Sequence, residues 1–232
     1  MKYTITTPLY YVNDKPHLGS SYTTIACDAI ARFQRLNGNS VLFLTGVDEH
    51  GQKIERTAEY RNLPPQIHCD EITEKYKYLW KKLNISYDRF VRTSSPEHKI
   101  LVHEFYSKVI ASDDVYMGRQ CGWYCVGCEE YKDVDSNEEH PMCSIHKKNL
   151  EWRDEENLFF RLSKYQEQIE KLIHLEGFIS PKSRRNEIIN FVSKGLRDFS
   201  ISRVNLNWGI NVPGNDEHTF YVWFDALLGY VS

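Results

Sequence analysis

Residues 1–114 alternate between short apolar runs and longer stretches in which apolar residues recur every three or four positions. Tyr3 to Thr7 is typical of a short strand that Pro8 ends or follows at a sheet edge, and residues 40–46 are typical of a strand buried on both faces. A helix is expected between them, from about Leu18 to Asn37, with Gly38 as its stop. Seven apolar residues at helical spacing predict the buried face of this helix: Tyr22, Ile25, Ala26, Ala29, Ile30, Phe33 and Leu36.

The same alternation continues with three more helices and a third strand. One helical stretch follows residues 48–51, and another follows Pro64 and Pro65. Residues 86–94 are the third strand candidate, and Ser95 is then expected to cap a helix that reaches about residue 112. Strands that alternate with helices in this way predict an α/β fold with a Rossmann-like, doubly wound parallel sheet.

The character of the chain changes near residue 115, where it becomes polar, rich in turns and punctuated by cysteines. Helices are expected over residues 162–173 and 187–196, and residues 220–224 are typical of a buried strand that precedes the start of a helix. We therefore expect three segments. Residues 1–114 would form the first half of the sheet domain, 115–200 an inserted connective module, and 201–232 the start of a truncated second half, as in a fragment of a longer protein.

Composition narrows the class of protein further. The chain of 232 residues is 41% hydrophobic, enough for a substantial core, and its net charge of -3 gives no overall basic field. Any contact with RNA must therefore come from local patches. No run of 18 apolar residues and no signal-peptide pattern is present, which favours neither a membrane span nor secretion. The expected location is the cytoplasm, or alternatively an organelle matrix or stroma.

Four residues of the inserted module have the spacing of a metal site. Cys125 and Cys128 are separated by two residues, and so are Cys143 and His146. Zn²⁺ prefers four such ligands in a tetrahedron, and a two-residue gap lets one tight turn present two of them. The sequence predicts a structural zinc that contributes folding energy to a module with few apolar residues. The other candidates, Cys121 and His140, lack the short gap, and the alternative interpretation is free cysteines beside a surface histidine.

A candidate nucleotide site follows the first predicted strand. His17 and Gly19 stand where an extended segment turns into a helix. In α/β sheets ligands bind at the carboxyl ends of strands, and the start of a helix there offers free N–H groups to a phosphate. Taken alone, this pattern also fits an ordinary turn with an exposed histidine.

Three stretches together resemble the methionyl-tRNA synthetases of bacterial and organellar type, which are class I aminoacyl-tRNA synthetases. They are TPLYYVNDKPHLGS (residues 7–20), FLTGVDEHGQKI (residues 43–54) and YVWFDALLGY (residues 221–230), with the cysteine module between the last two. The resemblance covers nearly the whole chain. It implies an enzyme that uses ATP, with Mg²⁺, to convert L-methionine to methionyl-adenylate and then transfers the aminoacyl group to tRNA(Met).

The resemblance also implies roles for particular residues. Residues 17–20 (HLGS) match the class signature, which places His17, Gly19 and Ser20 at the ATP phosphates as catalytic residues, although many relatives have a second histidine where this chain has Ser20. Arg203 matches a further catalytic arginine near the ATP site. For methionine, the resemblance implies that the Asp48 carboxylate and the Leu9 backbone carbonyl bind the ammonium group. It also implies a pocket for the methionine side chain, lined by Tyr11, Trp223, Ala226 and Tyr230.

Two features of the class are not found in the sequence: the lysine-rich second signature, which residues 181–185 and 192–196 match only superficially, and the anticodon-reading helical domain. We therefore expect this segment alone to activate methionine poorly or not at all. One alternative is a non-catalytic zinc-bearing module that contacts the tRNA acceptor end through Lys147, Lys148, Arg184 and Arg185. Another is a class I synthetase for a different amino acid, but the insert is too short for the editing domain of the leucine, isoleucine and valine enzymes.

Overall fold

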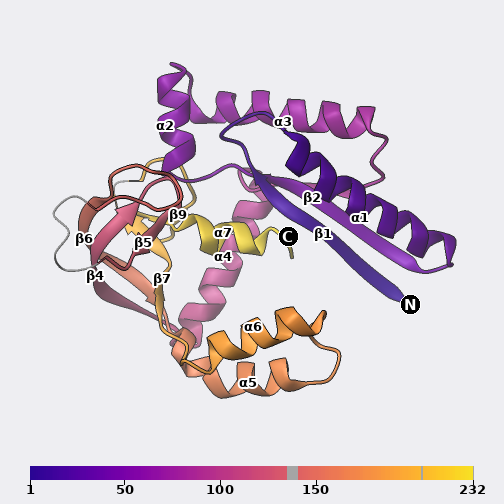
Figure 1. Ribbon diagram of the computed structural model, residues 1–232. Coiled ribbons are helices and arrows are strands. Elements are labelled where there is room, and N and C mark those ends of the chain that lie inside the picture. The colour runs from indigo at the N-terminus through magenta and orange to yellow at the C-terminus, as the bar shows by residue number, and fades with distance from the viewer. Residues whose placement is uncertain (135–140, 205, 232) are drawn as a thin grey trace.

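The computed structural model describes residues 1–134, 141–204 and 206–231, which form three sheets with helices around them (Figure 1). The first sheet contains β1 (Lys2–Tyr11), β2 (Ser40–Asp48) and β3 (Arg89–Arg92) in the order β1-β2-β3, with both pairs parallel. The predicted parallel α/β arrangement is therefore confirmed for these strands. Pro8 does not end β1, because the strand continues beyond a register shift between Thr6 and Leu9.

Helix α1 (Leu18–Leu36) has almost the predicted bounds, but its predicted buried face is wrong. Its buried residues are small or polar: Ser20, Thr24, Asp28 and Ala31. All seven apolar residues of the predicted face are exposed, up to 87% for Leu36. The reason is local hydrogen bonding. The hydroxyl of Tyr10 in β1 lies 2.7 Å from Thr24 Oγ1, and Asp28 accepts hydrogen bonds from the backbone and hydroxyl of Ser86, so the polar side of the helix faces the sheet.

Three further helices complete this half of the fold. They are α2 (Gln52–Tyr60), α3 (Pro65–Lys82) and α4 (Pro96–Ala111). The Oγ of Ser95 accepts a hydrogen bond from the backbone of His98 at 3.3 Å, so the predicted cap of α4 is confirmed. The core between the sheet and α2–α3 consists of Val12, Val47, Ile54, Cys69, Ile72, Tyr76 and Trp80.

The segment after residue 114 forms an antiparallel sheet and a helical hairpin. The sheet has the order β5-β4-β6-β7, from β4 (Val115–Cys125), β5 (Glu130–Lys132), β6 (Glu151–Phe160) and β7 (Phe199–Ser200). The 3-10 helix η1 (Leu162–Tyr165) leads into α5 (Gln166–His174), which pairs with α6 (Lys182–Val192) at the bottom of Figure 1. Helix α6 starts five residues earlier than its predicted range and ends at residue 192.

The predicted strand over residues 220–224 is wrong. A third sheet of β8 (Ser202–Val204), β9 (Asn211–Val212) and β10 (Asn215–Phe220) is antiparallel, and residues 222–228 form helix α7 (Val222–Leu228). Phe220, Phe224 and Leu228 recur every four residues and share one core cluster with Val102 and Tyr106. This helical spacing explains why the apolar run folds as a helix after its first residue.

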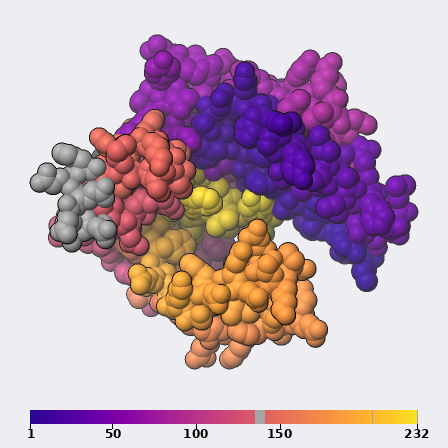
Figure 2. All heavy atoms as spheres, viewed as in Figure 1, coloured from indigo at the N-terminus to yellow at the C-terminus, as the bar shows by residue number. Residues whose placement is uncertain are grey.

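Helix α7 lies in the middle of the molecule. Figure 2 shows it (yellow) in a hollow between the N-terminal segment (indigo) and the α5–α6 hairpin (orange). Within the described residues, no helix has the length and the apolar character that crossing a membrane would require.

Candidate ligand pocket and metal centre

A cavity of about 350 Å³ lies where the carboxyl ends of β1 and β2 meet α7. All six residues that the resemblance implies for the amino acid line it: Leu9, Tyr11, Asp48, Trp223, Ala226 and Tyr230. They come from β1, from β2, and from α7 together with the turn that follows it. The structure therefore brings this predicted set together in one place.

Local backbone features make this meeting possible. Tyr11 and Asp48 are register partners at the ends of β1 and β2. Helix α7 approaches β1 closely because residue 229 is glycine: a Cβ there would lie 2.5 Å from Leu9 Cδ1. The Leu9 backbone N–H donates a hydrogen bond to the Tyr230 hydroxyl at 3.3 Å, which ties the end of the chain to the first strand.

Asp48 is a buried carboxylate, with 8% of its surface exposed. Burial raises the pKa of Asp48 well above its usual value, and the nearby negative charges of Asp225 and Glu129 raise it further. No salt bridge to Asp48 is formed within the described part of the chain; its backbone partner is the N–H of His50, at 3.5 Å. A carboxylate placed in this way gains most from a cationic ligand such as an ammonium group.

Glu129 is a cavity residue that sequence reasoning missed. It is 5% exposed, and its Oε1 accepts hydrogen bonds from the Tyr11 hydroxyl at 2.7 Å and from the backbone of Lys53 at 3.0 Å. A Cβ at residue 51 would lie 2.5 Å from the Glu129 carboxylate, and Gly51 has a φ of 108°, so glycine is required there. The position of Glu129 directly after Cys128 was the available signal.

His17, Gly19 and Ser20 lie at the start of α1 and do not line the cavity. His17 Nδ1 accepts a hydrogen bond from the Gly19 backbone at 3.0 Å, and Ser20 Oγ accepts one from the His17 backbone at 3.0 Å. These two bonds form a capping box. Ser20 is buried, whereas His17 and Gly19 are exposed. The Ser20 hydroxyl therefore caps the helix, while the His17 ring faces solvent.

Arg203 lies in the interior and is not itself among the residues that line the cavity. It is 5% exposed, and its Nη1 donates hydrogen bonds to Ser200 Oγ at 2.6 Å and to the Ser202 carbonyl at 2.7 Å. Its guanidinium stacks 4.0 Å from the ring centroid of Tyr221, the N-cap residue of α7. These contacts make Arg203 a support for the start of α7.

Glu49 anchors the loop that follows Asp48. It is completely buried and accepts hydrogen bonds from the Thr73 hydroxyl at 2.7 Å and from Arg92 Nε at 2.9 Å. The Ser94 hydroxyl and the indole N–H of Trp208 also donate to Glu49, to its carboxylate and its carbonyl respectively. These hydrogen bonds fix the backbone at residue 49 and thereby the position of the adjacent Asp48.

The four predicted metal ligands converge. The donor atoms of Cys125, Cys128, Cys143 and His146 all lie within 4.8 Å of one another. Cys128 Sγ is 3.6 Å from Cys143 Sγ and 3.3 Å from His146 Nδ1, close to the edges of about 3.5–3.8 Å expected of a tetrahedral zinc site. The fit to a metal ion is therefore good.

Backbone N–H groups donate hydrogen bonds to two of the three sulfur atoms, which stabilises the thiolate form that binds a metal ion. Cys125 Sγ accepts from the Cys128 N–H and Cys143 Sγ from the His146 N–H, each at 3.4 Å. The bond from His146 is the main cause that lowers the pKa of Cys143 to about 6. Cys121 is exposed on β4 and does not belong to the cluster, and His140 lies outside the described residues.

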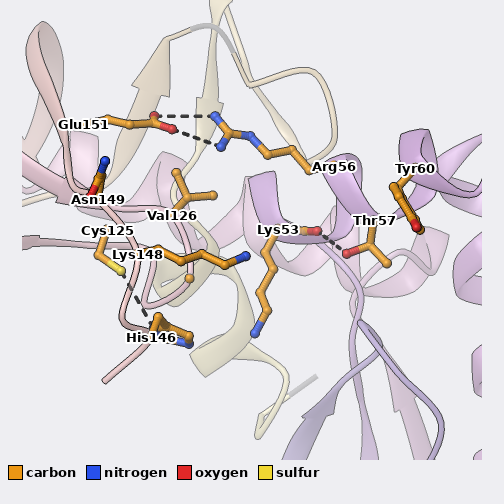
Figure 3. Close-up of a pocket in the computed structure, with 11 residues that line it drawn as sticks. Lys53, Arg56, Thr57, Tyr60, Cys125, Val126, His146, Lys148, Asn149 and Glu151 are labelled. Atoms are coloured by element: carbon orange, nitrogen blue, oxygen red, sulfur yellow. Dashed lines mark hydrogen bonds and ion pairs between the residues drawn. The ribbon is translucent and has the colours of Figure 1, made fainter. Parts of the chain in front are cut away.

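A second cavity, of about 360 Å³, separates α2 from the cysteine cluster (Figure 3). Lys53 and Lys148 extend from opposite walls into the same space, and Arg56 is held by Glu151 through a bond of 3.0 Å. Lys53 also lies over the Tyr11 ring, 5.5 Å from its centroid. The cavity therefore carries positive charge beside the first one.

The four basic residues of the proposed RNA patch do not form one surface. Lys147 and Lys148 belong to the loop of the cysteine cluster, whereas Arg184 and Arg185 lie on α6, in a separate part of the molecule (Figure 1). Arg184 forms a salt bridge with Glu187 at 2.7 Å, and Arg185 donates to the backbone carbonyls of α5.

Comparisons with known proteins show which family this chain resembles. The family model of tRNA synthetases class I (M) matches residues 3–137 and 132–232. A methionine–tRNA ligase of Nostoc sp. is 58% identical over 99% of this chain and 44% of its own length. The chloroplastic/mitochondrial methionine–tRNA ligase of Arabidopsis thaliana is 52% identical over 99% of this chain and 38% of its own length.

The fold agrees with this family. The methionyl-tRNA synthetase of Mycobacterium tuberculosis in complex with methionyl-adenylate superposes with a TM-score of 0.92 at 39% identity, over 99% of this chain and 46% of that one. The chain thus spans less than half the length of the relatives it matches. Because the family model covers nearly every residue, the chain belongs to the class I tRNA synthetases (M).

Proposed function

We propose that this chain forms part of a methionine–tRNA ligase, which activates L-methionine with ATP and Mg²⁺ and transfers the resulting methionyl group to tRNA(Met). The observation that carries the proposal is the cavity in which the buried carboxylate of Asp48, which forms no salt bridge within the described residues, lies among Tyr11, Trp223 and Tyr230. The M. tuberculosis relative, similar along nearly the whole chain, was solved with methionyl-adenylate.

In this proposal the cavity recognises both ends of the amino acid. Asp48 and the Leu9 carbonyl accept hydrogen bonds from the substrate ammonium. The thioether side chain packs among the rings of Tyr11, Trp223 and Tyr230, with Ala226 leaving room for it. Sulfur–aromatic contacts contribute roughly 0.3–1.5 kcal/mol each, which favours methionine over leucine or isoleucine.

The activation step needs positioning rather than a protein nucleophile. A carboxylate oxygen of methionine attacks the α-phosphorus of ATP, the bond to the bridging oxygen breaks, and pyrophosphate leaves with its electron pair. The start of α1, with its free N–H groups and partial positive charge, would face the phosphates, and the exposed His17 ring would donate to them. Gly19 allows the close approach. Ser20 and Arg203 support this geometry by capping α1 and by holding the start of α7.

We propose that the cysteine cluster holds a structural Zn²⁺. The ion would supply folding energy, and it would close the loop in which Glu129 directly follows the ligand Cys128. Because Glu129 accepts a hydrogen bond from Tyr11, the metal site and the methionine cavity share a wall. This coupling is consistent with our assignment of residues 115–200 to a connective module inserted between 1–114 and 201–232.

We further propose that the acceptor end of the tRNA passes the second cavity. Lys53 and Lys148 would contact its phosphates, directly beside the site where the aminoacyl group forms. The same cavity supports the second candidate function, a zinc-bearing module that binds tRNA without activating methionine. Such a role is compatible with either the cytoplasm or an organelle, as the chloroplastic/mitochondrial relative illustrates.

Calorimetric titration distinguishes the two candidates. For the ligase, L-methionine binds with one site per chain, and leucine and isoleucine bind at least roughly tenfold more weakly. For the module, tRNA binds while methionine and ATP produce no heat. A chain that binds leucine as tightly as methionine would contradict the proposed substrate.

A further inference from the structure

A buried carboxylate on α7 is held between two histidines. Asp225 Oδ2 lies 2.6 Å from His50 Nδ1, and its Oδ1 lies 2.9 Å from His98 Nε2. The side chains of all three residues are at most 1% exposed. Since a carboxylate only accepts, both ring nitrogens donate. The cluster joins the loop after β2, helix α4 and helix α7.

The opposite nitrogens of the two rings are also buried. Within the described residues, His50 Nε2 and His98 Nδ1 have no hydrogen-bond partner. Three buried polar groups with two unpaired nitrogens are costly compared with apolar residues of similar volume. Packing alone therefore does not account for this cluster. We interpret it as a device that fixes the orientation of the Asp225 side chain, because each histidine donates to one of its two oxygens.

Asp225 connects the cluster to the methionine cavity. It lies in α7 between Trp223 and Ala226, both of which line the cavity, whereas His50 follows Asp48 by two residues. Burial favours the uncharged form of Asp225, but the electrostatic interaction with His50 and the hydrogen bonds from His50 and His98 lower its pKa below the usual value. The two histidines thus hold a charged, oriented carboxylate at the back of the binding site.

We propose that His98 and His50 are positioning residues for methionine. Acting through Asp225, they fix the rotation and depth of α7, so that Trp223 and Ala226 meet the methionine side chain while Asp48 meets its ammonium. Neither imidazole touches the cavity. This inference rests on the proposed function, and it adds one histidine on α4 and one in the loop after β2 to the determinants of that site.

A pair of variants at residue 98 tests the geometry. In His98→Gln the side-chain nitrogen takes the place of Nε2 and still reaches Asp225, whereas in His98→Asn it takes the place of Nδ1 and falls short. His103→Gln is the matched control, because His103 is on the same helix and donates to the Asn211 carbonyl rather than to α7. The measurements are the Kd for methionine, the thermal unfolding of each variant, and the indole NMR signal of Trp223.

We expect His98→Asn to weaken methionine binding by roughly tenfold or more and to shift the Trp223 signal, and His98→Gln to restore most of both. His103→Gln should change neither. Equal methionine affinity and an unmoved Trp223 signal in the folded Asn and Gln variants would overturn the inference, even if both melt at lower temperature. Should His98→Asn not fold, Asp225→Asn provides the comparison, since its amide offers an acceptor oxygen to only one histidine.

The outcomes separate this inference from the proposed function. A wild-type chain that does not bind methionine contradicts the ligase proposal, and the Trp223 signal then still decides whether His98 positions α7. A wild-type chain that binds methionine with the same Kd in all variants contradicts the positioning role alone.

Discussion

Tyr11 and Asp48 face each other as register partners at the carboxyl ends of two parallel strands, and both line the same cavity. Each is buried enough that its charged form is disfavoured: burial raises the pKa of the Tyr11 hydroxyl and of the Asp48 carboxyl well above their usual values. The fold thus maintains a costly carboxylate at a place where a ligand can reach it. Such a cost is typical of a binding site rather than of a structural contact.

Asp48→Asn should therefore change methionine affinity and thermal stability in opposite directions. Because the pKa of Asp48 is raised in the folded state, folding is favoured at low pH, and this advantage is lost as the pH rises from the unfolded pKa to the folded one. At pH 7, above the pKa of an unfolded aspartate, the wild type carries a cost for burying this group. We expect Asp48→Asn to melt at a higher temperature than the wild type at pH 7 and to lose methionine affinity by roughly tenfold or more. Calorimetry and thermal unfolding measure the two effects; a variant that binds methionine normally would contradict the role of Asp48.

Removal of the metal should affect the cavity as well as the cysteine module. We expect one zinc per chain by atomic absorption, and we expect Cys143→Ser to abolish it, lower the melting temperature and weaken methionine binding through the displaced Glu129. Cys121→Ser is the matched control, because Cys121 is exposed and outside the cluster. If both serine variants retain equal zinc, the ligand set is wrong.

Glu49 provides a test of the loop that carries Asp48. Glu49→Gln removes the buried charge that pairs with Arg92 and leaves the more exposed Asp70 as its carboxylate partner, which should lower the free energy of unfolding by about 2 kcal/mol. The exposed pair of Lys77 and Glu74 is the control, since Glu74→Gln should cost no more than about 0.5 kcal/mol. Urea denaturation measures both. Equal effects of the two substitutions would show that Glu49 is not an anchor.

The second cavity predicts how tRNA binding depends on charge. Lys148→Gln should weaken binding of a tRNA acceptor-stem RNA and reduce the salt dependence of its affinity by about one unit of slope. Arg184→Gln should change little, because Arg184 lies on α6 and is paired with Glu187. Fluorescence anisotropy at several salt concentrations provides the comparison. A larger effect of Arg184→Gln would favour the α6 surface as the RNA contact.

Short sequence motifs correctly predicted the features that depend on a few neighbouring residues. The cysteine spacing found all four members of the metal cluster, and Ser95 located the start of α4. The resemblance carried by three short stretches predicted the six residues that line the cavity between β1, β2 and α7. Each of these predictions depends on a few neighbouring residues.

The strand predicted over residues 220–224 overlooked a local signal, the helical spacing of Phe220, Phe224 and Leu228. The other failures concern interactions between distant residues. Periodicity predicted an apolar buried face on α1, but hydrogen bonds from Tyr10 and Ser86 turn the face with Thr24 and Asp28 inward. Glu129 and His98 gain their roles only because residues more than a hundred positions away approach them, namely Tyr11 and Asp225. Spacing along the chain does not predict such contacts, and the only local signal was the position of Glu129 directly after Cys128.

A crystal structure of the chain with methionyl sulfamoyl-adenosine, a stable analogue of the adenylate, tests the central claim most directly. The account predicts the amino group of the ligand within hydrogen-bond distance of Asp48, its thioether against Trp223, and its sulfamoyl group at the start of α1 beside His17. A ligand whose amino group lies away from Asp48, or whose sulfamoyl group lies far from His17, would contradict it.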